Sequence, residues 1–310
     1  MDSSPATPPT RDGGGQHLSS HDGRRRRSRR AFTGAAAAAV GLSLLGGRAL
    51  SAAGPARDPE LASADSRQPS RGTDRPTIVL VHGAWADGST WSKVSERLQA
   101  AGYDVRVPPN NLRGVGSDAA DLGSYLTTIP GPIVLVGHSY GGIVITNAAN
   151  GNSNVRSLVY VNAFVPAEGD TIVGLTHPPS IFAQDPANVF DFVPNPSVPP
   201  GAADAYVKAA LYGDAFANEG FNVREIGVLA ASQRPLSTQV FSEPSGRPAW
   251  DTIASWAVVG EDDRIIPVAE QISMAKRAGA EVVQVDAPHL SMLPAAQAVT
   301  NVIITAAKAG

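Results

Sequence analysis

The chain has 310 residues, of which 43% are hydrophobic and 6% aromatic, enough for one sizeable core without the apolar excess of a membrane protein. The formal net charge is -3, but eight Arg and three Asp lie in residues 1–53, so the remainder carries 17 basic and 25 acidic side chains. The remainder is mildly acidic, so it lacks the excess of basic residues that binds nucleic acids or anionic lipids. The absence of Cys excludes disulfides, thiolate nucleophiles and Cys-ligated zinc.

The first 53 residues have the pattern of an export signal. Residues 24–30 read Arg-Arg-Arg-Arg-Ser-Arg-Arg, and an Ala-, Gly- and Leu-rich stretch follows over residues 34–45. A helix of roughly 12 residues spans under about 20 Å, which is too short for a hydrocarbon core of about 30 Å. Ser28-Arg29-Arg30-Ala31-Phe32 resembles the twin-arginine export motif, and Ser51-Ala52-Ala53 offers small residues for cleavage.

We therefore predict that residues 1–53 form a twin-arginine-type signal peptide. The protein would be secreted through the twin-arginine export machinery and would have no stable membrane anchor. The alternative interpretation of the same residues is a disordered basic arm. Residues 54–75 are rich in Pro, Ala, Ser, Asp and Arg and show no hydrophobic period, so they are predicted to be a flexible linker.

Residues 76–310 have the pattern of one folded domain. Short β-branched runs alternate with longer amphipathic stretches, which is typical of a parallel sheet covered by helices on both faces. Four nearly all-apolar runs, at residues 78–81, 133–136, 158–161 and 257–259, predict strands buried on both sides. Residues 105–107 and 282–285 supply two further strands, which gives about six. Helical spacing predicts helices at residues 89–101, 117–126, 140–149, 267–278 and 294–307. The predicted fold class is α/β, with a mostly parallel sheet.

The alternation breaks between about residues 166 and 248. This stretch is rich in Pro, contains Phe182, Phe190 and Phe192, and has no clean period. Ligands bind beyond the carboxyl ends of the strands in open α/β sheets, so we predict an inserted cap over those ends. The three Phe side chains indicate either an apolar substrate pocket or simply the packed core of the cap.

The strongest local motif is the G-x-S-x-G sequence Gly137-His138-Ser139-Tyr140-Gly141. It comes directly after the strand predicted at residues 133–136 and directly before an apolar helix. A sharp strand-to-helix turn strains the Ser backbone and exposes its hydroxyl, and the flanking glycines avoid collisions inside that turn. We predict that Ser139 is a catalytic nucleophile.

A Ser nucleophile needs a base, and the base needs an acid that orients it. Among the six histidines, only His289 follows the last predicted strand on a loop beyond its carboxyl end; the others are His17, His21, His82, His138 and His177. Asp263 follows the strand that ends at Val259 and is the best candidate for the acid, although spacing alone does not exclude Glu261 or Asp262. The order Ser139, Asp263, His289 is nucleophile, acid, base.

Two backbone N–H groups are needed to stabilise the oxyanion that develops on an attacked carbonyl. Tyr140, directly after the nucleophile, would supply one of them. The other would come from Ala84, in the loop after the first strand. No two histidines stand at helix-facing ligand spacing next to a carboxylate, so we predict no metal and no cofactor.

Together these residues resemble the α/β-hydrolase superfamily, over residues 77–307. The motifs Val81-His82-Gly83-Ala84-Trp85, Gly137 to Gly142 and Ala287 to Leu293 resemble most closely the bacterial esterases akin to plant methylesterases and hydroxynitrile lyases. The pattern G-x-x-D-x-x-x-P, framed by Gly260 and Pro267, matches Asp263 to the acid of that group. The resemblance implies a serine hydrolase that cleaves carboxylic esters through an acyl-enzyme on Ser139, with lactones or related acyl compounds as further candidate substrates. Together with the predicted signal peptide, this makes the predicted function that of an exported esterase.

Two other functions stay open. The lyases of the group generally carry Thr where this chain has Gly83 and Lys where it has Leu290, so both departures favour ester hydrolysis over carbon–carbon cleavage. A Ser nucleophile also argues against dehalogenases and epoxide hydrolases, which use Asp. The third hypothesis is a ligand-binding receptor that retains the catalytic residues.

Overall fold

The computed structural model describes residues 75–310 of the chain. The predicted signal peptide, residues 1–53, and all but the last residue of the predicted linker, residues 54–75, lie outside the described residues. Among the helices of the described part, none has both the length and the apolar character needed to cross a bilayer.

A six-stranded parallel sheet forms the centre of the described structure, in the order β2-β1-β3-β4-β8-β9. Its strands are β1 (Thr77–Val81), β2 (Val105–Arg106), β3 (Ile133–His138), β4 (Val155–Val161), β8 (Ala254–Gly260) and β9 (Glu281–Val285). Every residue of β1 and β3 is buried, as continuous apolar runs in a parallel sheet require, whereas the edge strand β9 is largely exposed. The α/β prediction with about six strands is confirmed.

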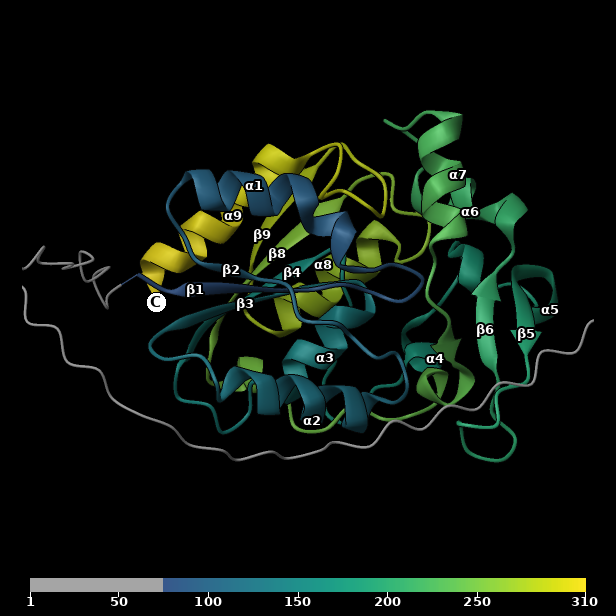
Figure 1. Cartoon of the computed structure of the whole chain (residues 1–310), viewed down its shortest axis with the longest axis horizontal. Coiled ribbons are helices and arrows are strands. Elements are labelled where there is room, and N and C mark those ends of the chain that lie inside the picture. The colour runs from purple at the N-terminus through teal and green to yellow at the C-terminus, as the bar shows by residue number, and fades with distance from the viewer. Residues whose placement is uncertain (1–74) are drawn as a thin grey trace, which may run out of the picture. The chain divides into compact units, whose positions relative to one another are not determined.

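Helices cover both faces of this sheet (Figure 1). Helices α1 (Ser92–Ala100) and α9 (Ala296–Ala309) pack together on one face, and α2 (Val115–Leu126) and α3 (Tyr140–Ala148) pack together on the other. Helix α8 (Val268–Arg277) packs against β8 and β9. The helix predicted from residue 89 begins as the 3-10 turn η1 (Gly88–Trp91), because the Asp87 carboxylate accepts the Ser89 N–H and caps that turn.

Between β4 and β8 the chain leaves the sheet and forms the elements of residues 166–248, called the cap segment below (Figure 1). It contains a separate antiparallel sheet in the order β5-β6-β7. Its strands and helices, with the short η4 that follows, are α4 (Ile172–Leu175), η2 (Ile181–Ala183), α5 (Pro186–Val189), β5 (Phe190–Val193), β6 (Asp204–Val207), α6 (Ala209–Phe216), α7 (Val223–Ala231), β7 (Leu236–Ser237), η3 (Thr238–Phe241) and η4 (Ala249–Asp251). Most of these elements have four residues or fewer, too few to establish a period in the sequence.

Candidate active site

Ser139 lies in a sharp turn between the end of β3 and the start of α3. Its backbone has φ 53 and ψ -123, a conformation that non-glycine residues rarely adopt. The neighbouring chain segments approach so closely that a β-carbon on Gly137 would lie 2.6 Å from the Gly141 carbonyl oxygen. A β-carbon on Gly141 would lie 2.7 Å from the Val81 carbonyl oxygen. Glycine at both positions therefore permits the turn that the G-x-S-x-G pattern predicts.

His289 and Asp263, the predicted base and acid, lie in direct contact. Nδ1 of His289 lies 2.8 Å from Oδ2 of Asp263, and both side chains are fully buried. A carboxylate only accepts hydrogen bonds, so Nδ1 carries the proton and Nε2 of the neutral ring is left with a lone pair. This Nε2 is buried and has no hydrogen-bond partner among the described residues, so it makes no hydrogen bond to Oγ of Ser139 in this structure.

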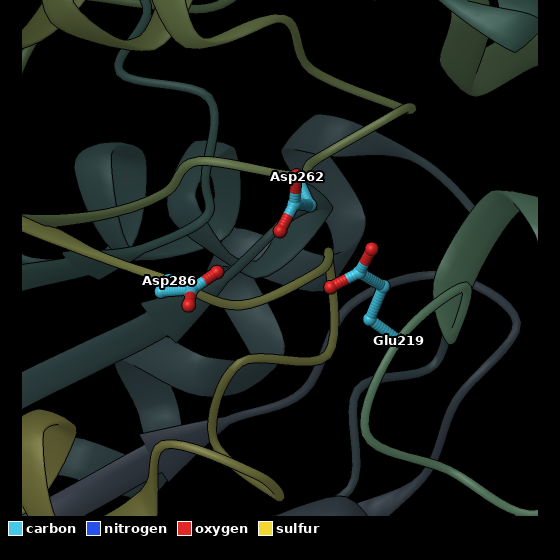
Figure 2. A group of neighbouring side chains, drawn as sticks. All are labelled: Glu219, Asp262 and Asp286. Atoms are coloured by element: carbon cyan, nitrogen blue, oxygen red, sulfur yellow. The ribbon is translucent and has the colours of Figure 1, made fainter.

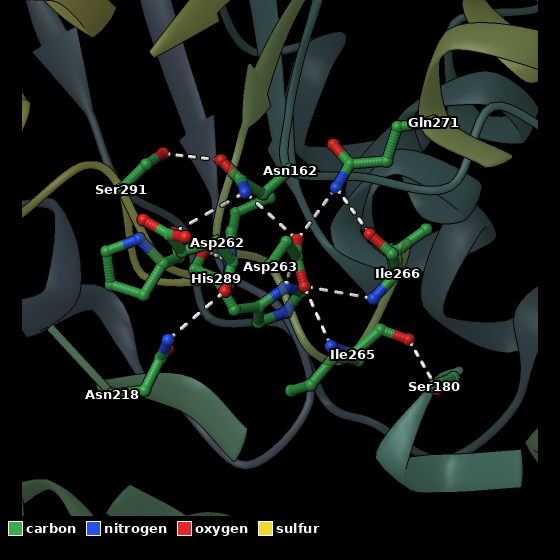
Figure 3. Close-up of polar contacts among 12 residues, drawn as sticks. Asn162, Ser180, Asn218, Asp262, Asp263, Ile265, Ile266, Gln271, His289 and Ser291 are labelled. Carbon is green, nitrogen blue, oxygen red and sulfur yellow. Dashed lines mark hydrogen bonds and ion pairs between the residues drawn. The ribbon is translucent and has the colours of Figure 1, made fainter. Parts of the chain in front are cut away.

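The Asp263 carboxylate accepts four further hydrogen bonds (Figure 3). Oδ1 accepts the backbone N–H groups of Ile265 and Ile266, at 2.8 and 2.9 Å. Oδ2 accepts Nδ2 of Asn162 at 2.9 Å and Nε2 of Gln271 at 2.8 Å. Because all of these donors favour the ionised carboxylate, they offset the cost of burying it and fix its orientation toward His289.

Asn162 connects the acid loop to the base loop. It follows β4 with φ 44, and its Oδ1 accepts the hydroxyl of Ser291 at 2.5 Å, while its Nδ2 donates to Asp263. Ser291 stands two residues after His289, so one amide contacts both loops. Sequence reasoning missed Asn162, Gln271 and Ser291. Asn162 could have been found as the polar residue that directly follows β4, since functional groups gather at the carboxyl ends of parallel strands.

The two alternatives for the acid lie elsewhere. The Asp262 carboxylate points toward Glu219 and Asp286, and ligand atoms of the three groups all lie within 4.8 Å of one another (Figure 2). The Glu261 side chain is exposed. Among the described residues, Asp263 is therefore the carboxylate that contacts His289.

The histidine beside the nucleophile, His138, supports the base loop. Its Nε2 donates to the backbone carbonyl oxygen of His289 at 3.0 Å, and the two rings lie 4.7 Å apart between centroids. Complete burial, with the neighbouring His289, lowers the pKa of His138 well below its usual value. His82 is also buried, and this lowers its pKa; its Nδ1 donates to the Gly83 carbonyl oxygen at 2.9 Å. Both rings are therefore neutral hydrogen-bonding groups.

Both predicted oxyanion donors, Ala84 and Tyr140, line one cavity together with Ser139. Tyr140 is the first residue of α3, and the first N–H groups of a helix have no acceptor within it. The Tyr140 side chain is directed away into the core, where its hydroxyl donates to Oδ2 of Asp118 at 2.8 Å. This hydrogen bond and the burial of the ring anchor Tyr140 at the start of α3.

This cavity has a volume of about 250 Å³, and most of its wall is apolar. Its lining residues are Ala84, Trp85, Ser139, Tyr140, Phe164, Ile172, Val173, Thr176, Phe182, Ala183, Gln184, Pro186, Leu236, Phe241 and Ile265. None of them is charged. Of the three cap phenylalanines, Phe182 lines the cavity, Phe190 is buried against Trp85, and Phe192 is 45% exposed. Phe182 therefore lines a cavity, whereas Phe190 belongs to the packed core.

Comparisons with known proteins agree with this architecture. The model of the alpha/beta hydrolase family matches residues 78–302. The chain is 38% identical over 125 residues to the carbendazim hydrolyzing esterase of Nocardioides sp. (strain SG-4G). This alignment covers 34% of this chain and 51% of the esterase. It is also 31% identical over 105 residues to methylesterase 8 of Arabidopsis thaliana, in an alignment that covers 29% of this chain and 38% of the methylesterase. The aligned regions thus span about half or less of these relatives.

Among solved structures, the chain is similar to a pyrethroid hydrolase from Sphingobium faniae JZ-2. The TM-score is 0.60 and the sequence identity 22%, and the alignment covers 76% of this chain and 98% of the other. The likeness in structure supports the same fold. The resemblance of the sequence to esterases of the methylesterase group is confirmed.

The geometry around His289 predicts different effects for two adjacent carboxylates. Replacing Asp263 with Asn should lower kcat by about 10³- to 10⁴-fold, because an amide at this place favours the wrong tautomer of the imidazole. Asp262→Asn should retain kcat within about threefold, because the Asp262 side chain faces Glu219 and Asp286. Steady-state hydrolysis of a p-nitrophenyl ester measures both. Equal losses in the two variants would contradict the assignment of the acid.

Proposed function

Because the chain belongs to the alpha/beta hydrolase family, we propose that it is an exported serine esterase that cleaves carboxylic esters through an acyl-enzyme on Ser139. The observation that carries the proposal is the buried Asp263–His289 pair, whose free Nε2 is the atom that would activate the nucleophile. The relatives named as esterases support the reaction class. The strained turn at Ser139 supports the choice of nucleophile.

In the proposed reaction, Oγ of Ser139 attacks the ester carbonyl carbon while Nε2 of His289 accepts the hydroxyl proton. The negative charge that forms on the carbonyl oxygen accepts hydrogen bonds from the N–H groups of Ala84 and Tyr140. Asp263 stabilises the imidazolium, which then donates its proton to the departing alkoxide. Water attacks the acyl-enzyme with His289 again as the base, and this releases the carboxylic acid and free Ser139. The reaction needs no cofactor.

The substrate that the cavity fits best is an uncharged ester with an apolar group. The lining residues carry no formal charge, and the wall is mostly aliphatic and aromatic. A carboxylate or ammonium group would lose its water shell in this cavity without gaining a charged partner. Burying even a neutral polar group without a hydrogen bond costs on the order of 2 to 7 kcal/mol, and burying a charged group costs more. By their names, two of the similar proteins hydrolyse carbendazim and pyrethroids, and a third is a methylesterase. These names support an ester as the substrate class.

Carbon–carbon lysis on the same scaffold is the less favoured function. Leu290 is fully buried, and its backbone N–H donates to the Phe216 carbonyl oxygen at 3.1 Å. No Lys lines the cavity within the described residues, so nothing in the pocket supplies the cation that the lyases of this group carry after their base.

A matched pair of substrates tests the proposal. p-Nitrophenyl hexanoate and mono-p-nitrophenyl adipate have acyl chains of equal length, but the second ends in a carboxylate that is too far from the ester to cyclise readily onto it. The full chain should hydrolyse the hexanoate with a kcat/KM about 100-fold higher, because only the charged chain must be desolvated. Ser139→Ala should retain only a residual rate. Undiminished turnover by Ser139→Ala, or no turnover by the wild type, would overturn the proposed mechanism.

The proposal of export rests on the residue pattern at 24–53 alone, which lies outside the described residues. Replacing Arg29 and Arg30 together with Lys should leave the esterase inside the cell, because the export machinery recognises the arginine pair. Esterase activity in the medium and in the cell fraction measures this. Secretion of the double variant at the wild-type level would argue for the disordered basic arm instead.

A further inference from the structure

Trp85, in the loop after β1, is held by three hydrogen bonds that all come from the cap segment. Its backbone N–H donates to the Arg234 carbonyl oxygen at 3.1 Å, and its indole Nε1 donates to the Ala205 carbonyl oxygen at 2.8 Å. Its own carbonyl oxygen accepts the hydroxyl of Tyr212 at 2.9 Å. The ring of Trp85 also stacks on that of Phe190, with centroids 5.4 Å apart.

The backbone of Trp85 is strained where these bonds meet. Its φ is 54, in the left-handed region that a bulky side chain rarely adopts. Such a conformation costs about 1 to 3 kcal/mol and persists only where surrounding contacts enforce it. The contacts that enforce it here come from β6, α6 and the segment between α7 and β7. The cap segment therefore restrains the loop after β1 at its strained residue.

That loop contains the proposed oxyanion donor. Ala84 directly precedes Trp85, so the hydrogen bonds that hold the Trp85 backbone also restrain the position of Ala84 in this loop. An oxyanion donor acts at hydrogen-bond distance from a charge that exists only in the transition state. A small displacement of this loop would consequently reduce the rate of the chemical step more than the binding of the ester.

Helix α6 contacts the loop of the base as well. Phe216 stands one helical turn after Tyr212, and its carbonyl oxygen accepts the backbone N–H of Leu290, directly after His289. The Phe216 ring lies 5.5 Å from the His289 ring and stacks on the Tyr212 ring at 4.4 Å, measured between centroids. One short helix thus contacts both the oxyanion loop and the base loop.

We infer that α6 is a positioning element that sets the oxyanion donor of Ala84 relative to the base, His289, and that Tyr212 is the positioning residue for the donor. The cap segment then has a second role beside forming the wall of the substrate cavity. This inference rests on the proposed esterase function. It assigns no contact with the substrate to Tyr212, which is absent from the cavity lining.

The Tyr212 hydroxyl is suited to this role. Its side chain is fully buried, and burial raises its pKa above the usual value, so the hydroxyl stays protonated and remains a donor. Without it, the Trp85 carbonyl would lose its partner in an interior where an unsatisfied group costs about 1 to 3 kcal/mol. The loop could then relax from its left-handed conformation and displace Ala84.

The test is Tyr212→Phe in the full chain, with Tyr160→Phe as the matched control. Tyr160 is likewise a fully buried tyrosine, on β4, and its hydroxyl is bonded to that of Thr146 at 2.9 Å, within the core. For p-nitrophenyl butyrate, Tyr212→Phe should lower kcat about tenfold or more while KM changes less than about twofold. Tyr160→Phe should keep the kcat of the wild type, whatever it does to the unfolding temperature.

Inhibitor binding separates positioning from a loss of stability. The hydroxyl of Ser139 adds to the carbonyl carbon of a trifluoromethyl ketone, and the carbonyl oxygen becomes an oxyanion. The matching methyl ketone binds without forming this covalent adduct. Tyr212→Phe should raise the Ki of the trifluoromethyl ketone by the same factor as it lowers kcat, and leave that of the methyl ketone unchanged. An unchanged kcat, or equal losses in both tyrosine variants, would overturn the inference. A wild type that neither turns over nor forms the adduct would instead overturn the proposed function.

Discussion

The site depends on one constraint, the close approach of the end of β1 and its following loop to the turn between β3 and α3, in which Ser139 has a positive φ. Gly83, Gly137 and Gly141 allow this approach, since a β-carbon on any of them would lie within 3.0 Å of a neighbouring heavy atom. Among the described residues, four non-glycines have positive φ, and three of them belong to the site: Trp85, Ser139 and Asn162. Strain of this kind persists where surrounding structure enforces it, and each of the three lies in a dense set of contacts.

The electrostatics of the site follow from burial. The side chains of Asp263 and His289 are fully buried. Donors from three different segments surround the carboxylate, and its hydrogen bond with Nδ1 of His289 defines the tautomer of the imidazole. The cavity that Ser139 lines has no charged residue in its wall, so in the proposed reaction the oxyanion would be stabilised by backbone N–H donors. The parallel sheet brings these groups together because its strands all end at the same edge.

Much of this could be predicted from the sequence, and the exceptions have physical reasons. The buried strands were predictable because continuous apolar runs need both faces covered, and the turn at Ser139 because its glycines are obligatory. Asp263 could not be separated from Asp262 by spacing, since which carboxylate turns inward depends on the backbone donors of Ile265 and Ile266. Asn162 and Tyr212 act through partners about 100 residues or more away in the chain, which no local pattern records. The small strands of the cap were too short to show a period.

The most direct test of the account is the site at which a fluorophosphonate reacts. Intact mass and peptide fragmentation of the labelled full chain measure both the number of adducts and the residue that carries them. The account predicts one adduct, on Ser139, formed faster than in Asp263→Asn because the oriented imidazole activates the hydroxyl. No adduct, or an adduct on another residue that persists in Ser139→Ala, would contradict the assignment of Ser139 as the nucleophile.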